Sequence, residues 1–478
     1  MAASRRRFPQ VKKISTPEAM SAYLAEQGID LPLDDVVEPS PQGPLAAPIK
    51  IGSRLEAENR FAILPMEGWD GTTDGRPTPD LERRWLRFGA SGAGLVWGEA
   101  TAVAPEGRAN PNQLMINEET AEYLGDLRGR MVAARALEFD GAHLVAGLQL
   151  THSGRWSRPL GEPLPRVAYR QSQLDRRLPV SDASVLSDDE LDELVDVYVR
   201  AGMLAADAGF DFVDIKHCHG YLLHELLSAR TRPGRYGGSF EGRTRVLRSV
   251  VEQLRTQRPD LTIAVRLSAV DPGPYLEDED GIGYPEPLDQ PPYLFGPDEQ
   301  GNPLGETHQF LDLCSELGVA LVCVTIGSPY YNPHVTRPAY HPALDGYLPP
   351  REPLAEVAYH LETTAALTRA HPDLVVIGSG YSYLQELLPN AAQYQVRAGN
   401  VGMVGIGRMA LSYPNLPADV LSGNTMDTKM ICRTFSDCTT GPRIGTASGC
   451  YPLDDHYKKS EARVAIAAAK KKKRTGVG

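Results

Sequence analysis

The sequence has few cysteines and no long apolar run, and both shortages narrow the class of protein. Six cysteines in 478 residues, irregularly spaced, do not form a disulfide framework and are typical of reduced thiols in the cytoplasm. No apolar stretch approaches the roughly 18 residues of a membrane span. The basic amino terminus MAASRRRFPQVKK is not followed by an apolar segment, so we expect no secretion.

Basic residues are also fewer than acidic ones, with 49 lysines and arginines against 61 aspartates and glutamates. The formal net charge of −12 argues against a nucleic-acid surface as the main function. We expect a small-molecule substrate as partner, and neither nucleic acid nor a membrane. The basic run from Lys470 to Arg474 is an exception, and we expect it to lie in a solvated, flexible tail over residues 464–478. The sequence does not decide between a monomer and a homo-oligomer.

A G-x-G-x-x-G turn after the first strand is absent, which argues against a doubly wound open sheet. Instead, eight short apolar runs alternate with helical segments and predict a (β/α)8 barrel. The runs begin near residues 61, 94, 144, 212, 262, 320, 374 and 401. The helices are expected at about 78–90, 118–138, 187–209, 242–257, 306–317, 352–370 and 383–397.

The barrel is predicted to span residues 51–415, after an amino-terminal arm over 1–50 that contains one short helix at 17–27. A carboxyl-terminal extension over 416–463 follows. Two long segments, about 271–306 and 330–352, are too long for simple connections and are expected to cover the site as lids.

Polar residues cluster where the predicted strands end, which is the functional face of such a barrel. The densest cluster is KHCHGY at 216–221. Neither C-x-x-C nor H-E-x-x-H spacing occurs there, so we expect no metal site. We expect Cys218 to be a small packing residue and not a thiolate nucleophile.

Two glycine-rich loops follow the last two strands and predict a phosphate site. They contain Gly378, Ser379 and Gly380 in one loop, and Gly407 and Arg408 in the other. Glycine lets backbone N–H groups approach an anion, and arginine adds a charge-assisted clamp.

Six motifs occur in a fixed order over about residues 55–415: NRFAILPM, GLVWGEATAVAPEGR, QLTHSGR, HGYLLHELLS, VRLS and VGIGR. In these motifs the chain resembles the old yellow enzyme family of FMN-dependent barrels, and in particular its branch similar to 2,4-dienoyl-CoA reductase and trimethylamine dehydrogenase. The resemblance implies an FMN-dependent oxidoreductase with FMN across the barrel mouth. It places Pro65, Met66, Glu67, Ala100, Gln149 and Arg266 around the flavin ring, and the two glycine loops at its phosphate.

The same resemblance assigns His219 to the binding of the substrate's activating oxygen and Tyr221 to proton donation. Lys216 stands where the family usually has histidine. Two interpretations stay open: Lys216 is a permanent cation that binds an anionic substrate oxygen, or it pairs with a carboxylate such as Glu67.

Relatives in this branch hold an iron–sulfur cluster with four cysteines after the barrel. Here only Cys432, Cys438 and Cys450 are available, so we expect no cluster. Electrons then reach FMN from NAD(P)H for reduction of a conjugated C=C bond, or from an oxidised substrate such as an amine, with oxygen or a carrier as acceptor.

Overall fold

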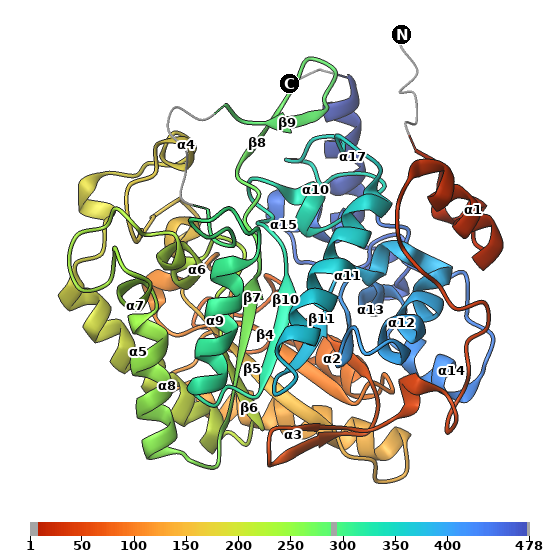
Figure 1. The fold of residues 1–478 in the computed structure, drawn as a ribbon, viewed down its shortest axis with the longest axis horizontal. Coiled ribbons are helices and arrows are strands. Elements are labelled where there is room, and N and C mark those ends of the chain that lie inside the picture. Colours follow the sequence, from red (N-terminus) through yellow and green to blue (C-terminus); the bar gives the residue numbers. More distant parts are fainter. Residues whose placement is uncertain (1–7, 288–293, 476–478) are drawn as a thin grey trace.

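The computed structural model describes residues 8–287 and 294–475 (Figure 1). Eight parallel strands close into a barrel, which confirms the predicted (β/α)8 fold. Their order around the barrel follows the chain, and each overlaps a predicted apolar run. The strands are β3 (Phe61–Ile63), β4 (Leu95–Ala102), β5 (Val145–Thr151), β6 (Phe212–Ile215), β7 (Thr262–Ser268), β10 (Leu321–Thr325), β11 (Val375–Gly378) and β12 (Met403–Ile406).

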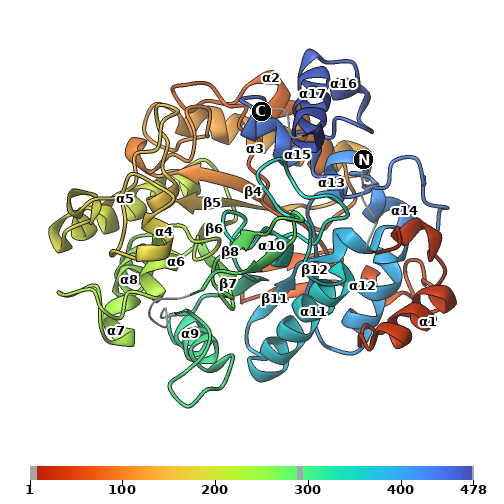
Figure 2. The ribbon, with the colours of Figure 1, turned by 90° about the horizontal axis from the view of Figure 1, so that it is seen from above.

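Helices between the strands surround the barrel, as Figure 2 shows from above. The longer ones are α2 (Pro79–Gly89), α3 (Ala121–Glu138), α5 (Asp188–Asp207), α8 (Arg245–Gln257), α9 (Gly305–Glu316), α11 (Pro353–Ala370), α12 (Leu388–Arg397) and α14 (Leu416–Ser422). The start of α5 is set by sequence, because Ser187 and Glu190 form a reciprocal capping box.

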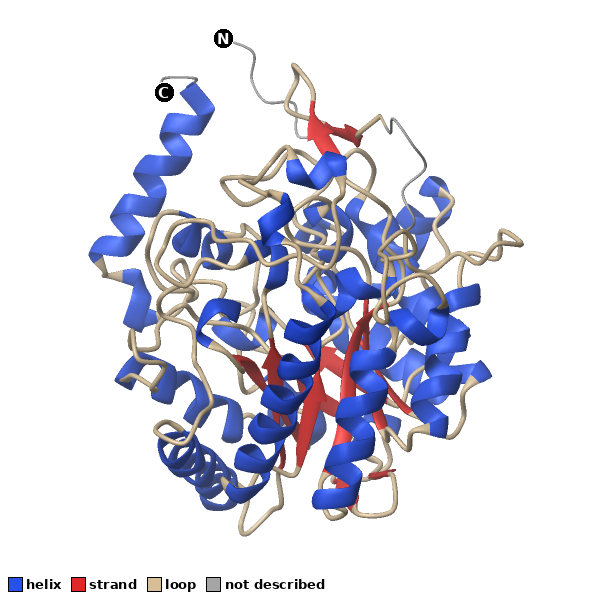
Figure 3. Ribbon diagram, turned by 90° about the vertical axis from the view of Figure 1, so that its left-hand side faces the viewer, coloured by secondary structure: helices blue, strands red, loops and turns tan. Residues whose placement is uncertain are grey.

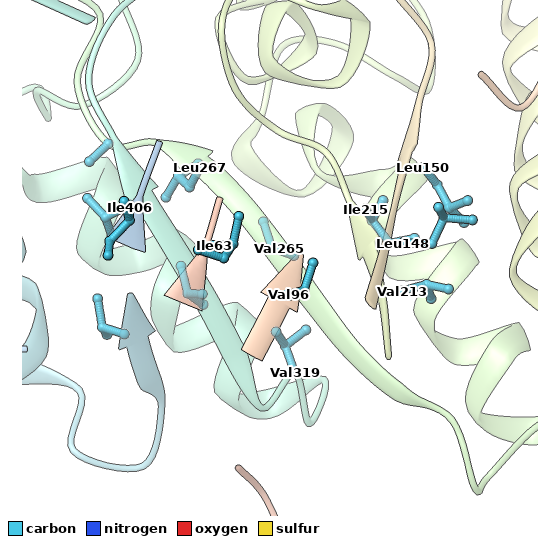
Figure 4. Packing of buried hydrophobic residues seen from close by; sticks show 14 of the residues in the cluster. Ile63, Val96, Leu148, Leu150, Val213, Ile215, Val265, Leu267, Val319 and Ile406 are labelled. Atoms are coloured by element: carbon cyan, nitrogen blue, oxygen red, sulfur yellow. The ribbon is translucent and has the colours of Figure 1, made fainter. Parts of the chain in front are cut away.

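The apolar core has two layers, one on each face of the barrel wall. Alternate strand residues such as Leu95 and Trp97 fill the barrel interior. The residues between them, such as Val96, face the helices, and Figure 4 shows this outer layer with Leu148 and Val213. Because both faces are buried, the strands are continuous apolar runs rather than alternating ones.

The helix expected at 383–397 is divided in the structure. Residues Tyr381–Leu387 form 3-10 turns, and α12 begins only at Leu388. Pro389 explains the division, because proline fits the first turn of a helix but not its interior. Gln385 takes a left-handed φ of 54° at the break.

Both ends of the described chain pack on the barrel. In the arm, α1 (Pro17–Gln27) matches the predicted helix, and Tyr23 donates a 2.6 Å hydrogen bond to Glu352. A hairpin of β1 (Ile49–Ile51) and β2 (Leu55–Ala57) precedes the first barrel strand.

The carboxyl-terminal segment differs from the expected flexible tail. Its residues Glu461–Thr475 form α17, after α15 (Asp437–Arg443) and α16 (Asp455–Lys458). Ile466 is buried against Tyr451 and Tyr457, and the Lys470 ammonium pairs with Asp437. A buried apolar anchor and this ion pair order the helix despite its run of lysines.

Above the carboxyl ends of the barrel strands lie the two long segments (Figure 3). The first forms a hairpin of β8 (Tyr275–Glu277) and β9 (Gly283–Pro285), and the second contains α10 (Pro333–Thr336). A bridge between Ile282 and Leu348 joins them. Among the described residues, no helix has both the length and the apolar character needed to cross a bilayer.

Candidate functional site

A cavity of about 230 Å3 opens at the carboxyl ends of the strands, where the sequence predicted the site. Thirteen of the fourteen predicted site residues line it. They are Pro65, Met66, Glu67, Ala100, Gln149, Lys216, His219, Tyr221, Arg266, Ser379, Gly380, Gly407 and Arg408.

Gly378 is the exception, because it is not among the residues that line the cavity. A Cβ atom on Gly378 would meet Thr364 and Tyr381 at 3.3 Å, so this position faces the helix layer and not the cavity. The reason is the alternation of strand residues. Gly380, with φ of 97°, has the left-handed backbone that glycine tolerates.

One side of the cavity is organised by Asp214, a residue that sequence reasoning missed. Its carboxylate accepts hydrogen bonds from Gln149 Nε2 at 2.6 Å, from Trp97 Nε1 at 3.0 Å and from the Arg266 backbone N–H at 2.7 Å. Burial raises the pKa of Asp214 to about 6, opposed by its bond to Gln149. The only signal in the sequence was an acid within an apolar strand.

Arg266 offers unused donors at this side of the cavity. Its Nη1 donates to the Pro65 carbonyl at 3.2 Å, while its buried Nε has no partner among the described residues. Because Gln149 uses its N–H on Asp214, its carbonyl oxygen is left as an acceptor. The pair therefore fits a planar ligand edge that both accepts and donates hydrogen bonds.

A β-bulge in β4 decides which residue faces the cavity. Strand β5 pairs Leu148 with Gly98 and Gln149 with Ala100, so Glu99 is the extra residue. Ala100 consequently lines the cavity, while Glu99 turns toward α2.

Glu99 belongs to a buried ion network outside the cavity wall. It lies 2.8 Å from Arg84, and Arg84 also forms two hydrogen bonds with Asp70. The Gly68 N–H donates to Glu99 at 2.9 Å, so the network fixes the backbone that follows Glu67.

Lys216, His219 and Tyr221 lie together in the cavity wall. The Lys216 ammonium lies 3.7 Å from the centre of the Tyr221 ring. The Tyr221 hydroxyl is 2.8 Å from that of Tyr330, whose ring stacks on Trp156 at 4.2 Å. The described residues contain no ion pair of Lys216 within 4 Å.

His219 has a left-handed φ of 66°, which is uncommon for a residue with a side chain. Its N–H donates to Ser268 Oγ at 2.9 Å and its carbonyl accepts from Ser328 Oγ at 2.8 Å. These bonds hold a strained backbone that directs the imidazole to the cavity, as strained residues at functional sites often do.

Burial changes the charges in this cluster. It lowers the pKa of Lys216 to about 8, with Cys218 and Glu67 opposing. It raises the pKa of Glu67 to about 7, opposed by Lys216. Burial also lowers the pKa of His219 well below its usual range, which leaves a neutral imidazole.

The other members of the cluster are not arranged for chemistry. His217 Nδ1 bonds to the Ile215 carbonyl at 2.6 Å, and burial raises the pKa of Cys218 to about 11. A group of three or more metal-binding side chains is not found in the part of the chain that the structure describes.

Several cavity residues were not named from the sequence, although one of their segments was expected to cover the site. The lid over 330–352 contributes Tyr330 and Arg337, and α15 of the extension contributes Thr439 and Arg443. Cys432, Cys438 and Cys450 surround a smaller apolar cavity nearby. Loops and extensions have no periodicity that indicates where they fold back.

Residues 44–280 match the sequence model of the NADH:flavin oxidoreductase / NADH oxidase family. An NADPH dehydrogenase of Listeria monocytogenes is 34% identical over 219 residues, which are 45% of this chain and 60% of that protein. An NADPH dehydrogenase of Bacillus subtilis is 31% identical over 231 residues, which are 48% and 64%. The chain thus spans less than two thirds of these relatives.

Solved structures share the fold over more of the chain. A 2-naphthoyl-CoA reductase in complex with 2-naphthoyl-CoA aligns with a TM-score of 0.65 and 19% identity, over 86% of this chain and 57% of that one. Old Yellow Enzyme from Pichia sp. aligns with a TM-score of 0.55 and 21% identity, over 80% and 88%. Over residues 44–280, the chain is therefore similar in sequence to the NADH:flavin oxidoreductase / NADH oxidase family.

Proposed function

We propose that the protein is an FMN-dependent oxidoreductase that reduces the C=C bond of a conjugated carbonyl or acid, with NAD(P)H as hydride source. The observation that carries the proposal is the arrangement of Gln149 and Arg266 around Asp214, with the buried Arg266 Nε left without a partner. These groups face a cavity whose wall also contains the Gly407–Arg408 loop.

The cavity residues fit FMN at both ends. Gln149 and Arg266 would hold the pyrimidine edge of the ring, and Ser379, Gly380, Gly407 and Arg408 would hold the phosphate. A Cβ atom on Gly407 would meet nothing within 4 Å, so the wall is open there. When bound, FMN supplies an acceptor and donor of hydride.

The chain's own residues supply charge stabilisation and a proton. The Arg266 guanidinium stabilises negative charge at the pyrimidine edge, and Lys216 with neutral His219 donates hydrogen bonds to the substrate's conjugated oxygen. The Tyr221 hydroxyl gives its proton to the substrate carbon next to the activating group. Burial raises the pKa of Tyr221 well above its usual range, so this proton is present at neutral pH.

An oxidative function with an amine substrate is the second candidate, and Lys216 weighs against it. A protonated amine would bind favourably over a tyrosine ring. The Lys216 ammonium already lies over the Tyr221 ring and would repel a second cation. The reductive function is therefore favoured.

Anaerobic titration of the purified protein tests the proposal. We expect a yellow protein with one FMN per chain, bleached by NADH or NADPH and recoloured by a conjugated carbonyl. Bleaching by an amine but not by either nicotinamide would support the oxidative function. A colourless protein that does not take up added FMN would contradict both.

The Lys216→Ala and His219→Ala variants should retain FMN but bind phenol-type ligands at least about tenfold more weakly. The reason is that each substitution removes a donor from the oxygen-binding position, and such hydrogen bonds contribute about 1.5 kcal/mol or more. Ligand affinity is measured from the change in flavin absorbance. Unchanged affinity in both variants would remove these residues from the site.

The affinity for benzoate, whose carboxylate is charged throughout, should fall as pH rises from 6 to 9. Glu67 becomes negative as pH passes about 7, and Lys216 loses its charge as pH passes about 8, so both changes disfavour an anion. In Lys216→Met only the lower step should remain. A benzoate dissociation constant that is flat across this range would contradict the assignment.

A further inference from the structure

A second cavity of about 190 Å3 adjoins the site and has no role in the function proposed above. Five residues belong to the walls of both cavities: Pro329, Tyr330, Arg337, Arg408 and Thr439. The second cavity lies under the β8–β9 hairpin, which contributes Tyr275, Leu276 and Glu277.

The wall shared by the two cavities contains two arginines, Arg337 and Arg408, that form no ion pair among the described residues, although the Asp345 carboxylate lies close enough to raise the pKa of Arg337. Arg337 Nη1 donates to Thr439 Oγ1 at 2.9 Å, and Arg408 Nη2 donates to the Pro338 carbonyl at 2.6 Å. In the described part of the chain, neither guanidinium has a carboxylate within 4 Å. By contrast, Arg443, which lines the first cavity, pairs with Asp345 at 2.5 Å.

Burial and the neighbouring Arg443 and Arg408 lower the pKa of Arg337 to about 10. An arginine held beside two other arginines is stabilised by an anion. Arginine presents a planar fork of donors that matches phosphate oxygens. Arg408 is already assigned to the FMN phosphate, so Arg337 is available for a second anion.

The far part of the second cavity is aromatic. Tyr275 and Tyr347 stack with ring centres 6.0 Å apart, and His334 lies edge-on to Tyr275 at 4.5 Å. The His334 Nδ1 is 2.8 Å from the Tyr347 hydroxyl, which fixes both rings. Rigid tyrosine faces bind planar, weakly polar groups such as a purine base.

The first cavity contains the proposed reaction site at the barrel mouth, and Arg337 lies in the wall that it shares with the second cavity. Tyr275 and Tyr347, here called the tyrosine chamber, line the second cavity beneath the hairpin. We propose that Arg337 and the tyrosine chamber bind the diphosphate and the base of an adenine nucleotide whose reacting end reaches the barrel mouth. This rests on the proposed function and extends it: the ligand is the tail of NAD(P)H or of a substrate carried on coenzyme A, and both share this chemistry.

Calorimetric titration of the FMN-loaded protein with ADP and with pyrophosphate tests the site. Arg337→Gln keeps a donor for Thr439 but removes the charge, and should weaken both ligands about 10- to 100-fold. Tyr275→Leu should weaken ADP and leave pyrophosphate unchanged. Arg130→Gln, which alters an exposed pair with Glu82, is the matched control and should bind both as the unaltered protein does.

FMN content, measured in each variant, separates this proposal from the proposed function. A colourless unaltered protein refutes the flavin assignment, whereas a yellow protein that does not bind ADP refutes only the nucleotide site. Loss of FMN from Arg337→Gln with unchanged ADP affinity would show that Arg337 serves the flavin phosphate, and would overturn the proposal. Displacement of ADP by NADPH, NADH or coenzyme A identifies the source, and displacement by none of them overturns it.

Discussion

Replacing Tyr221 by phenylalanine should slow reduction of a conjugated C=C substrate by about 10²- to 10⁴-fold, the range for loss of a general acid. The variant keeps the ring under the Lys216 ammonium and removes only the hydroxyl that bonds to Tyr330. Reduction of the flavin by NAD(P)H should be unaffected, because it needs no proton from this group. Stopped-flow absorbance separates the two half-reactions.

The matched control for this experiment is Tyr330→Phe. It removes the hydrogen-bond partner of Tyr221 but leaves the donor, so a loss of less than about tenfold is expected. A normal rate of C=C reduction in Tyr221→Phe would mean that the proton comes from solvent or from another side chain.

The Arg84→Met variant should lose about 3–5 kcal/mol of unfolding free energy, since breaking a buried pair leaves a charge without compensation. Asp70 and Glu99 would both remain buried without their guanidinium. Urea unfolding followed by fluorescence gives the change. FMN affinity should fall as well, because Glu99 holds the backbone of Gly68 beside the cavity.

An exposed ion pair supplies the comparison for Arg84. Arg130 and Glu82 are both partly exposed, and loss of such a pair costs about 0–1 kcal/mol. If Arg84→Met were no less stable than Arg130→Met, the buried network would contribute no more than a surface pair.

The barrel could be predicted from sequence because each strand is buried on both faces. A continuous apolar run such as TIAVRL, ending in Arg266 and Ser268, shows both the strand and its functional end. Polar cavity residues such as Gln149, Lys216 and Arg408 were found in this way, since parallel strands carry their carboxyl ends to one face. The family resemblance, and not the strand pattern, placed Pro65, Met66, Glu67 and Ala100. Their roles toward a ligand stay predictions.

What could not be predicted depends on contacts between distant segments. Asp214 became visible as an organising residue only when Gln149 and Arg266 were placed beside it. Arg337 comes from a lid and Arg443 from the extension. These segments have no periodic residue pattern from which the direction of a side chain can be predicted. The packing of Ile466 likewise explains an ordered segment where lysines suggested a solvated one.

The bulge in β4 determines which residue of this strand should be varied to change the cavity. Counting every second residue from Trp97 would select Glu99 for mutagenesis, yet Ala100 is the side chain that lines the cavity. Deleting Ala100 would restore the regular pairing of the strand and place the Glu99 carboxylate at the cavity. Substitutions at Ala100 should therefore change which substrates are accepted. Substitutions at Glu99 should mostly destabilise the fold, because they break its buried ion pair with Arg84.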